Sequence, residues 1–229
     1  MTEITDKKVA IDNFNNKDKD MSLLDVSDDL RADKDVVIAA LARPNYSCKF
    51  YAASDELKAD KEVIMIAVKH GAYNIQHASE DLKEDKDLVV AAVKQNGHAI
   101  SLLIDKWKND KEIALIAVQQ NGRALRDVPD ELQADKEIVI SAVTNWGGAL
   151  EYAYEKLRAN KEVVLKALQK DIFVTSFTTA GLALQYASTE LRADKEVVMA
   201  AVSENGKAIK YASEELQADP DIIKASESK

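Results

Sequence analysis

The amino-acid sequence predicts an all-α fold, a superhelical α-solenoid of two-helix repeats with about 25 residues per repeat. Two observations predict it. A motif of Leu, two small or polar residues, Asp-Lys-Glu and a Val/Ile/Ala run recurs along the chain. The glycines fall at or beside one position of the repeat, the joint that follows the Val/Ile/Ala run. No segment has a convincing strand pattern. Because stacked repeats offer long surfaces rather than deep pockets, the repeat also argues against an enzyme.

The register of the repeat follows from one residue near the start of its first helix. This residue is Asp6, Asp33, Asp60, Asp85, Asp110, Asp135, Asn160, Asp194 and Asp219 in turn. We expect a single α-solenoid domain over residues 1–229. Its parts are a degenerate N-terminal capping repeat at 1–32, core repeats at 33–218 with an insertion at 171–180, and a truncated repeat or C-terminal cap at 219–229. Alternatively, the chain is a piece of a longer array.

Each repeat is expected to contain two short helices. The Asp caps the first, because its carboxylate accepts free backbone N–H groups, and the acidic residue two positions later favours the positive helix end. The first helix then runs, for example, from Lys86 to Asn96. A glycine just past its end is expected to supply a left-handed residue that closes the helix. The second helix follows, as from Ala208 to Leu216, with an apolar stripe at helical spacing.

The first helix is apolar on more than one side. In the run Val89–Val93 almost no polar face remains, so we expect this helix to be enclosed by its own second helix and by the next repeat. Helices this short are marginal alone. Stability is therefore expected to come from the stack.

Composition favours an intracellular chain. It is 46% hydrophobic and 31% charged, has no apolar run near the roughly 20 residues of a membrane span, and lacks the apolar core of a secretory signal at its start. One cysteine, Cys48, excludes an internal disulfide and fits a reducing compartment. The net charge of −9 argues against a phosphate-binding surface and for a basic or apolar partner.

Charged and aromatic residues recur in fixed slots of the repeat. The lysine row is Lys34, Lys61, Lys86, Lys111, Lys136, Lys161 and Lys195, and the adjoining acidic row is Asp55-Glu56, Glu80-Asp81, Asp130-Glu131 and Glu214-Glu215. Interleaved opposite charges predict a solvated salt-bridge edge rather than a binding strip, since nucleic-acid surfaces are basic. Tyr152, Tyr186 and Tyr211 share one slot with His77, which favours packing between repeats over a stacking platform.

Specific function is expected where the repeats differ. The largest difference is the insertion Asp171–Gly181, which carries Phe173 and Phe177. One interpretation is structural, namely a longer first helix or a loop folded onto the stack. The alternative is a patch for partner binding or for weak self-association through Ile172–Phe177. A second difference is the joint around Pro44, where the proline ends the first helix early and glycine is missing.

A row of variable residues just after the joint supplies the third candidate. His98, Arg123, Arg126 and Trp146 lie on consecutive repeats and predict a mixed patch for a partner, because Trp and Arg are favoured interface anchors. Trp146 replaces the Asn of the joint and is expected to be partly exposed. Trp107 occupies the Leu slot of the repeat and is expected in the core.

Residue patterns for catalysis are weak, and we predict no enzyme, no catalytic residues, no cofactor and no metal. Cys48 with His70 or His77 as base matches no cysteine-enzyme signature. His77 and Asp81 have the spacing of a ligand pair, but no third ligand is obvious. The glycines are too far apart for a phosphate-binding loop.

The segment Asp194–Leu216 closely resembles a family of short helical repeats of unknown function. The resemblance extends from about Leu23 to Lys224 and includes the pattern Asp-Lys-Glu-Val-Val-x-Ala-Ala-Val-x-x-Asn-Gly. The family is found in protists and in intracellular bacterial pathogens, where such chains are regarded as candidate effectors delivered into host cells. It implies no activity, substrate or site residues.

Together these observations predict a non-catalytic scaffold that binds a protein or peptide, one setting being a bacterial effector that binds a host protein. The alternatives are a helical-repeat nucleic-acid binder and an enzyme with an unrecognised site. We expect no membrane contact, a monomer or weak self-association, and a cytoplasmic location or translocation into a host cytosol.

Overall fold

The computed structural model describes residues 3–16, 18–43, 48–169 and 181–228. Within these residues nearly all regular structure is helical, and the β-structure consists of an isolated bridge between Ile4 and Val26. The all-α prediction is therefore confirmed. Contacts group the chain into two compact units, Met1–Trp107 and Lys108–Lys229, and each is described by itself. Their boundary lies inside one short helix, α8 (Asp105–Lys108), so the single-domain prediction stays a prediction.

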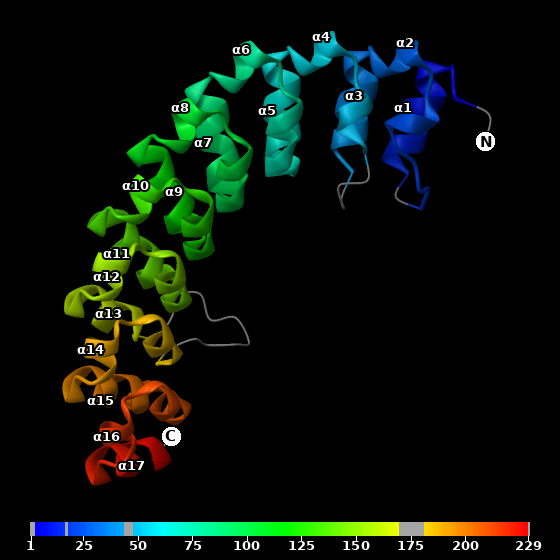
Figure 1. The fold of residues 1–229 in the computed structure, drawn as a ribbon. Helices are drawn as coiled ribbons and strands as arrows, with labels where there is room; N and C mark the ends of the chain where they lie inside the picture. Colours follow the sequence, from blue (N-terminus) through cyan, green and yellow to red (C-terminus); the bar gives the residue numbers. More distant parts are fainter. Residues whose placement is uncertain (1–2, 17, 44–47, 170–180, 229) are drawn as a thin grey trace. The chain divides into compact units, whose positions relative to one another are not determined.

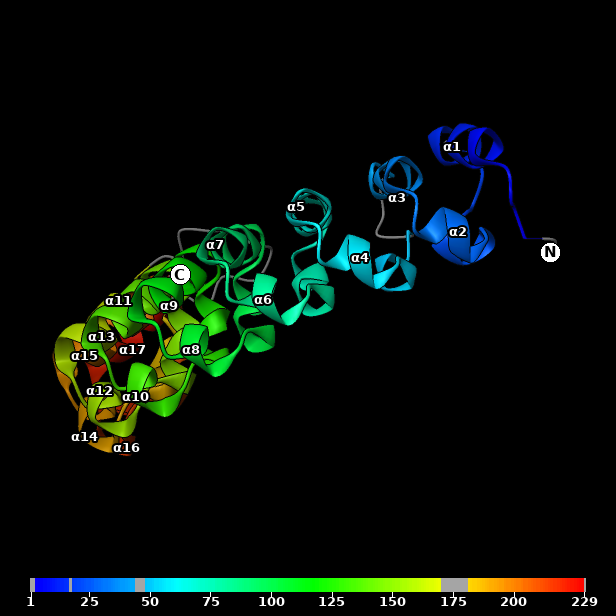
Figure 2. The ribbon, with the colours of Figure 1, turned by 90° about the horizontal axis from the view of Figure 1, so that it is seen from above.

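In the first unit, long α-helices lie side by side with short helices along one edge (Figures 1 and 2). The long helices are α1 (Lys7–Asn15), α3 (Lys34–Leu41), α5 (Lys61–His70) and α7 (Lys86–Gln95). The 3₁₀-helices are η1 (Leu23–Asp25), η2 (Phe50–Ala52), η3 (Ala72–His77) and η4 (Gly97–Leu102). The one-turn α-helices are α2 (Asp28–Arg31), α4 (Asp55–Lys58) and α6 (Glu80–Lys83).

The second unit repeats the same order of elements. Its long helices are α9 (Lys111–Gln120), α11 (Lys136–Asn145), α13 (Lys161–Ala167), α15 (Lys195–Glu204) and α17 (Pro220–Glu227). Its 3₁₀-helices are η5 (Gly122–Asp127), η6 (Gly147–Tyr152), η7 (Leu182–Tyr186) and η8 (Gly206–Tyr211). Its one-turn helices are α10 (Asp130–Gln133), α12 (Glu155–Arg158), α14 (Thr189–Arg192) and α16 (Glu214–Gln217). Consecutive 3₁₀-helices contact one another.

The predicted second helix is two elements rather than one. The segment expected to be helical from Ala208 to Leu216 contains the 3₁₀-helix η8, an extended residue at Ala212 and the one-turn helix α16. Ser213 causes the break, because its hydroxyl caps α16 by accepting from the N–H of Leu216. Ser54, Ser79 and Ser188 cap the equivalent turns in the same way.

The predicted caps of the long helices are confirmed. Asp85, for example, accepts from the N–H groups of Asp87 at 3.0 Å and Leu88 at 3.2 Å. At the position where Asp is replaced, Asn160 still accepts from the N–H of Val163. The register residue of each repeat is therefore the start signal of its long helix.

The predicted salt-bridge edge is also present, with different acidic partners from the adjoining row. Lys34 contacts the capping carboxylate of the next repeat, Asp60, and also Glu62, each at 2.7 Å. Further pairs of this kind are Lys7–Asp33, Lys61–Asp85, Lys111–Asp135, Lys161–Asp194 and Lys195–Asp219. Asp55 instead pairs within its own turn with Lys58. The ladder therefore joins the starts of neighbouring long helices.

The predicted left-handed glycine after the long helix is wrong for most joints. Gly71 has an extended backbone, φ −165°, and among the described glycines positive φ occurs at Gly181. Gly122 and Gly206 allow a close approach of the next repeat instead. A Cβ added to Gly122 would lie 2.4 Å from the carbonyl oxygen of Ala142 in the next long helix, and one added to Gly206 would lie 2.0 Å from that of Ser226.

The core is a row of small and branched apolar side chains. Each full-length helix buries its third, fourth, seventh and eighth residues, which in α5 are Val63, Ile64, Ala67 and Val68. The fifth and sixth residues of these helices, Met65 and Ile66 in α5, lie on the two sides of the buried face and are half-buried. The long helix is thus covered on more than one side, as predicted. Trp107 is buried and donates from Nε1 to the carbonyl oxygen of Lys83 at 3.0 Å, which confirms its core assignment.

The helix before the joint around Pro44, α3, has 8 residues, compared with 10 in α5 and α7. This helix ends at Leu41, before Pro44, as predicted, and Lys49 adopts the left-handed conformation with φ 55°. Residues 44–47, including Pro44, lie outside the described part of the chain, and so does the insertion with Phe173 and Phe177. The predictions for those residues are not tested by the structure.

Candidate functional site

The variable row lies on the 3₁₀-helices, and their geometry determines which side chains share a surface. In a 3₁₀-helix residues three apart are eclipsed, so the residues one and four positions after the joint glycine of each repeat lie on the same edge. Because η5, η6, η7 and η8 contact one another in order, these edges form one surface, which we call the 3₁₀ face of the second unit. Its two slots hold Arg123 and Arg126, Gly148 and Glu151, Leu182 and Gln185, and Lys207 and Lys210.

Arg123, Trp146 and Gly148 form a cluster on this face. The guanidinium carbon of Arg123 lies 4.7 Å from the centroid of the Trp146 ring, a cation–π contact. Gly148 leaves the room that the indole occupies, because a Cβ there would lie 2.3 Å from Cζ2 of Trp146. Tyr152 lies beside the same indole, with 6.4 Å between ring centroids. Trp146 is half-buried, so its predicted partial exposure is confirmed.

Trp146 occupies its position at the expense of a cap. In other repeats the corresponding residue is Asn96, Asn121 or Asn205, whose side chain accepts from the backbone N–H two residues later. Trp146 gives η6 no such side-chain cap. The preceding residue, Asn145, is buried and links two repeats instead, accepting from the N–H of Gly122 at 2.9 Å and donating to the carbonyl oxygen of Gln119 at 2.8 Å.

The 3₁₀ face of the second unit is cationic although the whole chain has a net charge of −9. Its exposed residues are Arg123, Arg126, Glu151, Lys207 and Lys210. Arg126 contacts the neighbouring Asp127 at 3.5 Å and keeps 61% of its side chain exposed. Burial raises the pKa of Tyr186, and the second cause of the shift is the Glu151 carboxylate. Glu151 therefore lies against that tyrosine in the middle of the face.

The other predicted partner-binding residues are not brought to this cluster by the described structure. His98 is half-buried in the second position of η4, in the first unit, where its backbone N–H is capped by Asn96. Phe173 and Phe177 lie outside the described residues. Lys207 and Lys210 belong to the same variable row of the sequence and occupy the same two slots as Arg123 and Arg126, but they were not among the predicted partner-binding residues. That shared register was the signal that could have identified them.

The residues considered for catalysis lie in ordinary structural surroundings. Cys48 is buried, and this burial raises the pKa of its thiol to about 11, so the reactive thiolate is scarce at neutral pH. His77 packs near the rings of Phe50 and Tyr51, with centroids 6.4 Å and 6.2 Å away. Burial, followed by the charges of Lys58 and Lys83, lowers the pKa of His77. In the part of the chain that is described, no three His, Cys, Asp or Glu side chains form a group that could hold a metal.

Comparison with known proteins shows the family of the chain. The family described as a domain of unknown function (DUF4116) matches residues 45–83, 60–105, 85–133, 135–179 and 175–217. These overlapping matches cover more than half of the chain, and the protein belongs to this family. Searches of curated proteins and of solved structures each found no match. Across the described ranges, no helix has both the length and the apolar character needed to cross a membrane.

Proposed function

We propose that the protein is a non-catalytic scaffold that binds a protein or peptide on the 3₁₀ face of its second unit. The observation that carries this proposal is the contrast between a constant backbone and variable exposed side chains. Caps, core positions and the lysine ladder recur from repeat to repeat, while the two outward slots of the 3₁₀-helices change from Arg to Gly, Leu and Lys. A constant frame with one variable edge is how repeat proteins build a specific surface.

The Trp146 position gives this proposal a second support. An Asn cap contributes on the order of 1 kcal/mol to a helix start, and Trp146 gives up that interaction for a half-exposed indole. Residues that break a local rule of their own repeat are expected at functional sites. Trp and Arg together are also the side chains most often found at the centres of interfaces.

A nucleic-acid reader is the alternative, and the same face favours it less. Such a reader stacks bases on open aromatic rings in a basic groove. The Trp146 ring already has Arg123 over it and the Gly148 backbone against it, so a base would have to displace one of them. The fourth pair of slots, counted from Arg123, does hold two lysines, but Glu151 interrupts the cationic path between the arginine pair and this lysine pair.

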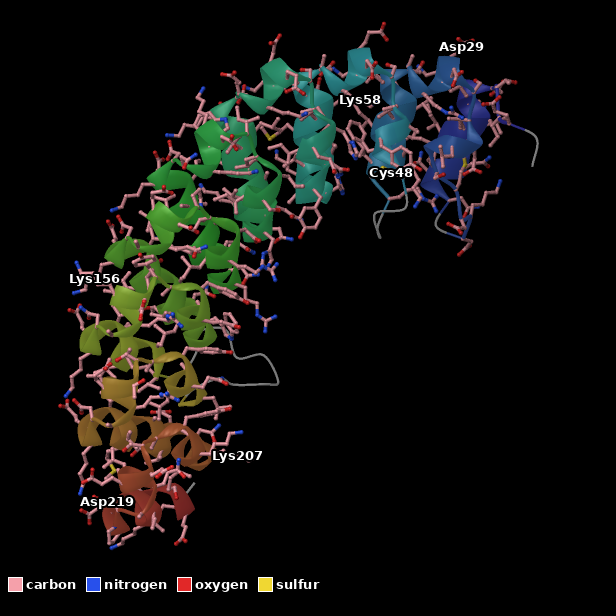
Figure 3. The ribbon with its side chains drawn as sticks, in the orientation of Figure 1. Asp29, Cys48, Lys58, Lys156, Lys207 and Asp219 are labelled. Carbon is pink, nitrogen blue, oxygen red and sulfur yellow. The ribbon has the colours of Figure 1, made fainter. Side chains whose placement is uncertain are left out.

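Affinity capture with matched charge reversals tests this function. We would compare the intact chain with Arg123→Glu, Arg126→Glu and the control Lys156→Glu, which makes the same charge change on α12. Lys156 and Lys207 lie at opposite edges of the second unit (Figure 3). We expect a protein partner to be lost with either arginine reversal and kept with the control. Retention of every partner by both arginine variants, with the fold intact, would show that the face is not the binding surface.

We also propose a biological setting, which the family resemblance suggests: the protein is an effector that acts in a host cytosol. This setting is separate from the binding proposal. A translocation reporter fused to the chain, expressed in an intracellular pathogen, is expected to enter host cells. Failure to find a translocated pool would contradict the setting and leave the scaffold proposal untouched.

A further inference from the structure

Arg123 is arranged to receive an anion. Its guanidinium is held over the Trp146 ring, and no described residue forms an ion pair with it. A guanidinium stacked in this way keeps its in-plane N–H donors directed away from the ring, where they match the two oxygens of a carboxylate. Arg126, one 3₁₀ turn later, places a second guanidinium on the same edge, about 6 Å further along the helix axis. The two form a donor pair on η5.

A second cationic pair occupies the same slots three 3₁₀-helices further on. Lys207 and Lys210 are exposed on η8, and Lys210 lies 4.8 Å from the centroid of the Tyr211 ring. Neither lysine has an ion pair with any residue that the structure describes. The lysines of the ladder, by contrast, are engaged, as Lys195 is with Asp219 and Asp221. Lys207 and Lys210 are therefore available to a partner.

The slots between the two pairs carry no positive charge. Gly148 and Glu151 on η6 are small and acidic, and Leu182 and Gln185 on η7 are apolar and neutral. The Glu151 carboxylate would repel an acidic group placed at the centre of the face. The face therefore has cationic ends and a centre that rejects carboxylates. Because charges separated by more than about 8 Å are screened at physiological salt, this local pattern outweighs the negative charge of the whole chain at contact range.

We propose that the 3₁₀ face of the second unit binds an extended peptide segment with acidic residues clustered at both ends, one cluster on Arg123 and Arg126 and the other on Lys207 and Lys210. This inference rests on the proposed function and specifies the chemistry of the partner. Three steps between packed helices span on the order of 25–30 Å. An extended chain covers that distance with about eight residues. The ligand is thus a short linear segment rather than a folded surface of mixed charge.

Fluorescence polarisation with two isomeric peptides tests the pattern. Each probe has about ten residues and the same composition; one carries paired Asp residues at both ends, and the other carries all of its Asp residues at the centre. We expect the first probe to bind the full chain about tenfold more tightly than the second, because the Asp residues of the second probe are repelled by Glu151 and leave both cationic ends without a partner. Equal affinity for the two probes would overturn the proposal.

Variants then locate the two ends. Arg123→Gln/Arg126→Gln and Lys207→Gln/Lys210→Gln are each expected to weaken the first probe about tenfold, while the control Lys156→Gln leaves it unchanged. Circular dichroism of each variant checks the fold. A single-stranded uridine oligonucleotide that binds more tightly than either peptide, and depends on the same residues, would overturn the proposal in favour of nucleic acid. If the peptides fail while captured partners still depend on Arg123, the acidic segment is wrong and the scaffold function stands.

Discussion

At the scale of single residues, the missing side chain has a different role at two glycines of the second unit, Gly122 and Gly148. At Gly122 the next repeat comes so close that a Cβ would lie 2.4 Å from the Ala142 carbonyl oxygen, and its N–H donates to Asn145. At Gly148 the vacant volume is filled by the Trp146 indole, which lies against Arg123. The first glycine allows the repeats to stack, and the second shapes the candidate binding face.

The close approach at Gly122 gives a prediction for stability. Gly122→Ala is expected to lower the free energy of unfolding by about 1–3 kcal/mol, because the methyl group must push against backbone that cannot rotate away. Chemical denaturation followed by circular dichroism measures this change. Gln119→Ala, at an exposed position near the end of α9, serves as the control and should change stability little. An unchanged or raised stability of Gly122→Ala would mean that the repeats are not this closely packed.

Prediction from sequence succeeds at this scale when the partner of a residue is local. The Asp caps could be predicted, since Asp85 bonds to N–H groups two and three residues away. The reason for the joint glycines could not, because the atom that excludes a Cβ at Gly122 belongs to another repeat. The cation–π contact of Arg123 with Trp146 was missed for the same reason, although both residues had been selected.

At the scale of elements, the 3₁₀-helix changes what the repeat can present. An α-helix at this place would turn residues three apart by 300° and splay their side chains, whereas the 3₁₀-helix aligns them. The break before the one-turn helix could have been read from the sequence. Ser54, Ser79, Ser188 and Ser213 stand three residues before a Leu, which is the spacing of a capping side chain. Pro129 occupies the same slot and forces Val128 to be extended.

The ladder between long helices predicts how stability depends on pH. A hydrogen bond from the lysine of the preceding repeat, above all, holds the pKa of Asp60, of Asp85 and of Asp194 below the usual range. Because the folded-state pKa is the lower one, this stabilisation is complete above the unfolded value of about 3.9 and is lost as pH falls through the folded-state pKa. The ladder's contribution to stability in urea unfolding should therefore be constant between about pH 6 and 7 and should decline below about pH 4.

Asparagine variants separate this effect from general acid unfolding. Asn retains the cap but carries no titrating group, as Asn160 does naturally. The triple variant Asp60→Asn/Asp85→Asn/Asp194→Asn should lose part of the decline at low pH. Three exposed aspartates without ion pairs in the described structure provide the control: Asp29→Asn, Asp81→Asn and Asp130→Asn. Identical pH profiles for the two triple variants would show that the ladder is not the source of the acid sensitivity.

At the scale of the whole molecule, stability and recognition are distributed along the chain in different ways. Within each unit, core and ladder contacts connect each repeat to its immediate neighbours, so the stability of such a stack is approximately a sum of local terms. The charges of the 3₁₀ face are not periodic: cationic pairs on η5 and η8 enclose two helices without cations. The repeat could therefore predict the fold of each unit, whereas the site depends on which slots break the pattern and on which side chains lie together.

The two tryptophans give each compact unit its own reporter, since Trp107 belongs to the first and Trp146 to the second. In chains that retain one tryptophan after Trp146→Phe or Trp107→Phe, denaturation followed by fluorescence reports on one unit at a time. Ile138→Ala and Ile64→Ala each remove a fully buried side chain, one from each unit, and should cost about 2–5 kcal/mol.

If the stability terms are local, each isoleucine variant lowers the denaturation midpoint of its own unit more than that of the other. Ile138→Ala should shift mainly the Trp146 transition, and Ile64→Ala mainly the Trp107 transition. The crossed design controls for effects of the tryptophan replacements, because both isoleucine variants are compared in the same two backgrounds. Equal shifts of both reporters in all four combinations would mean that the chain unfolds as one cooperative body, as a single domain does.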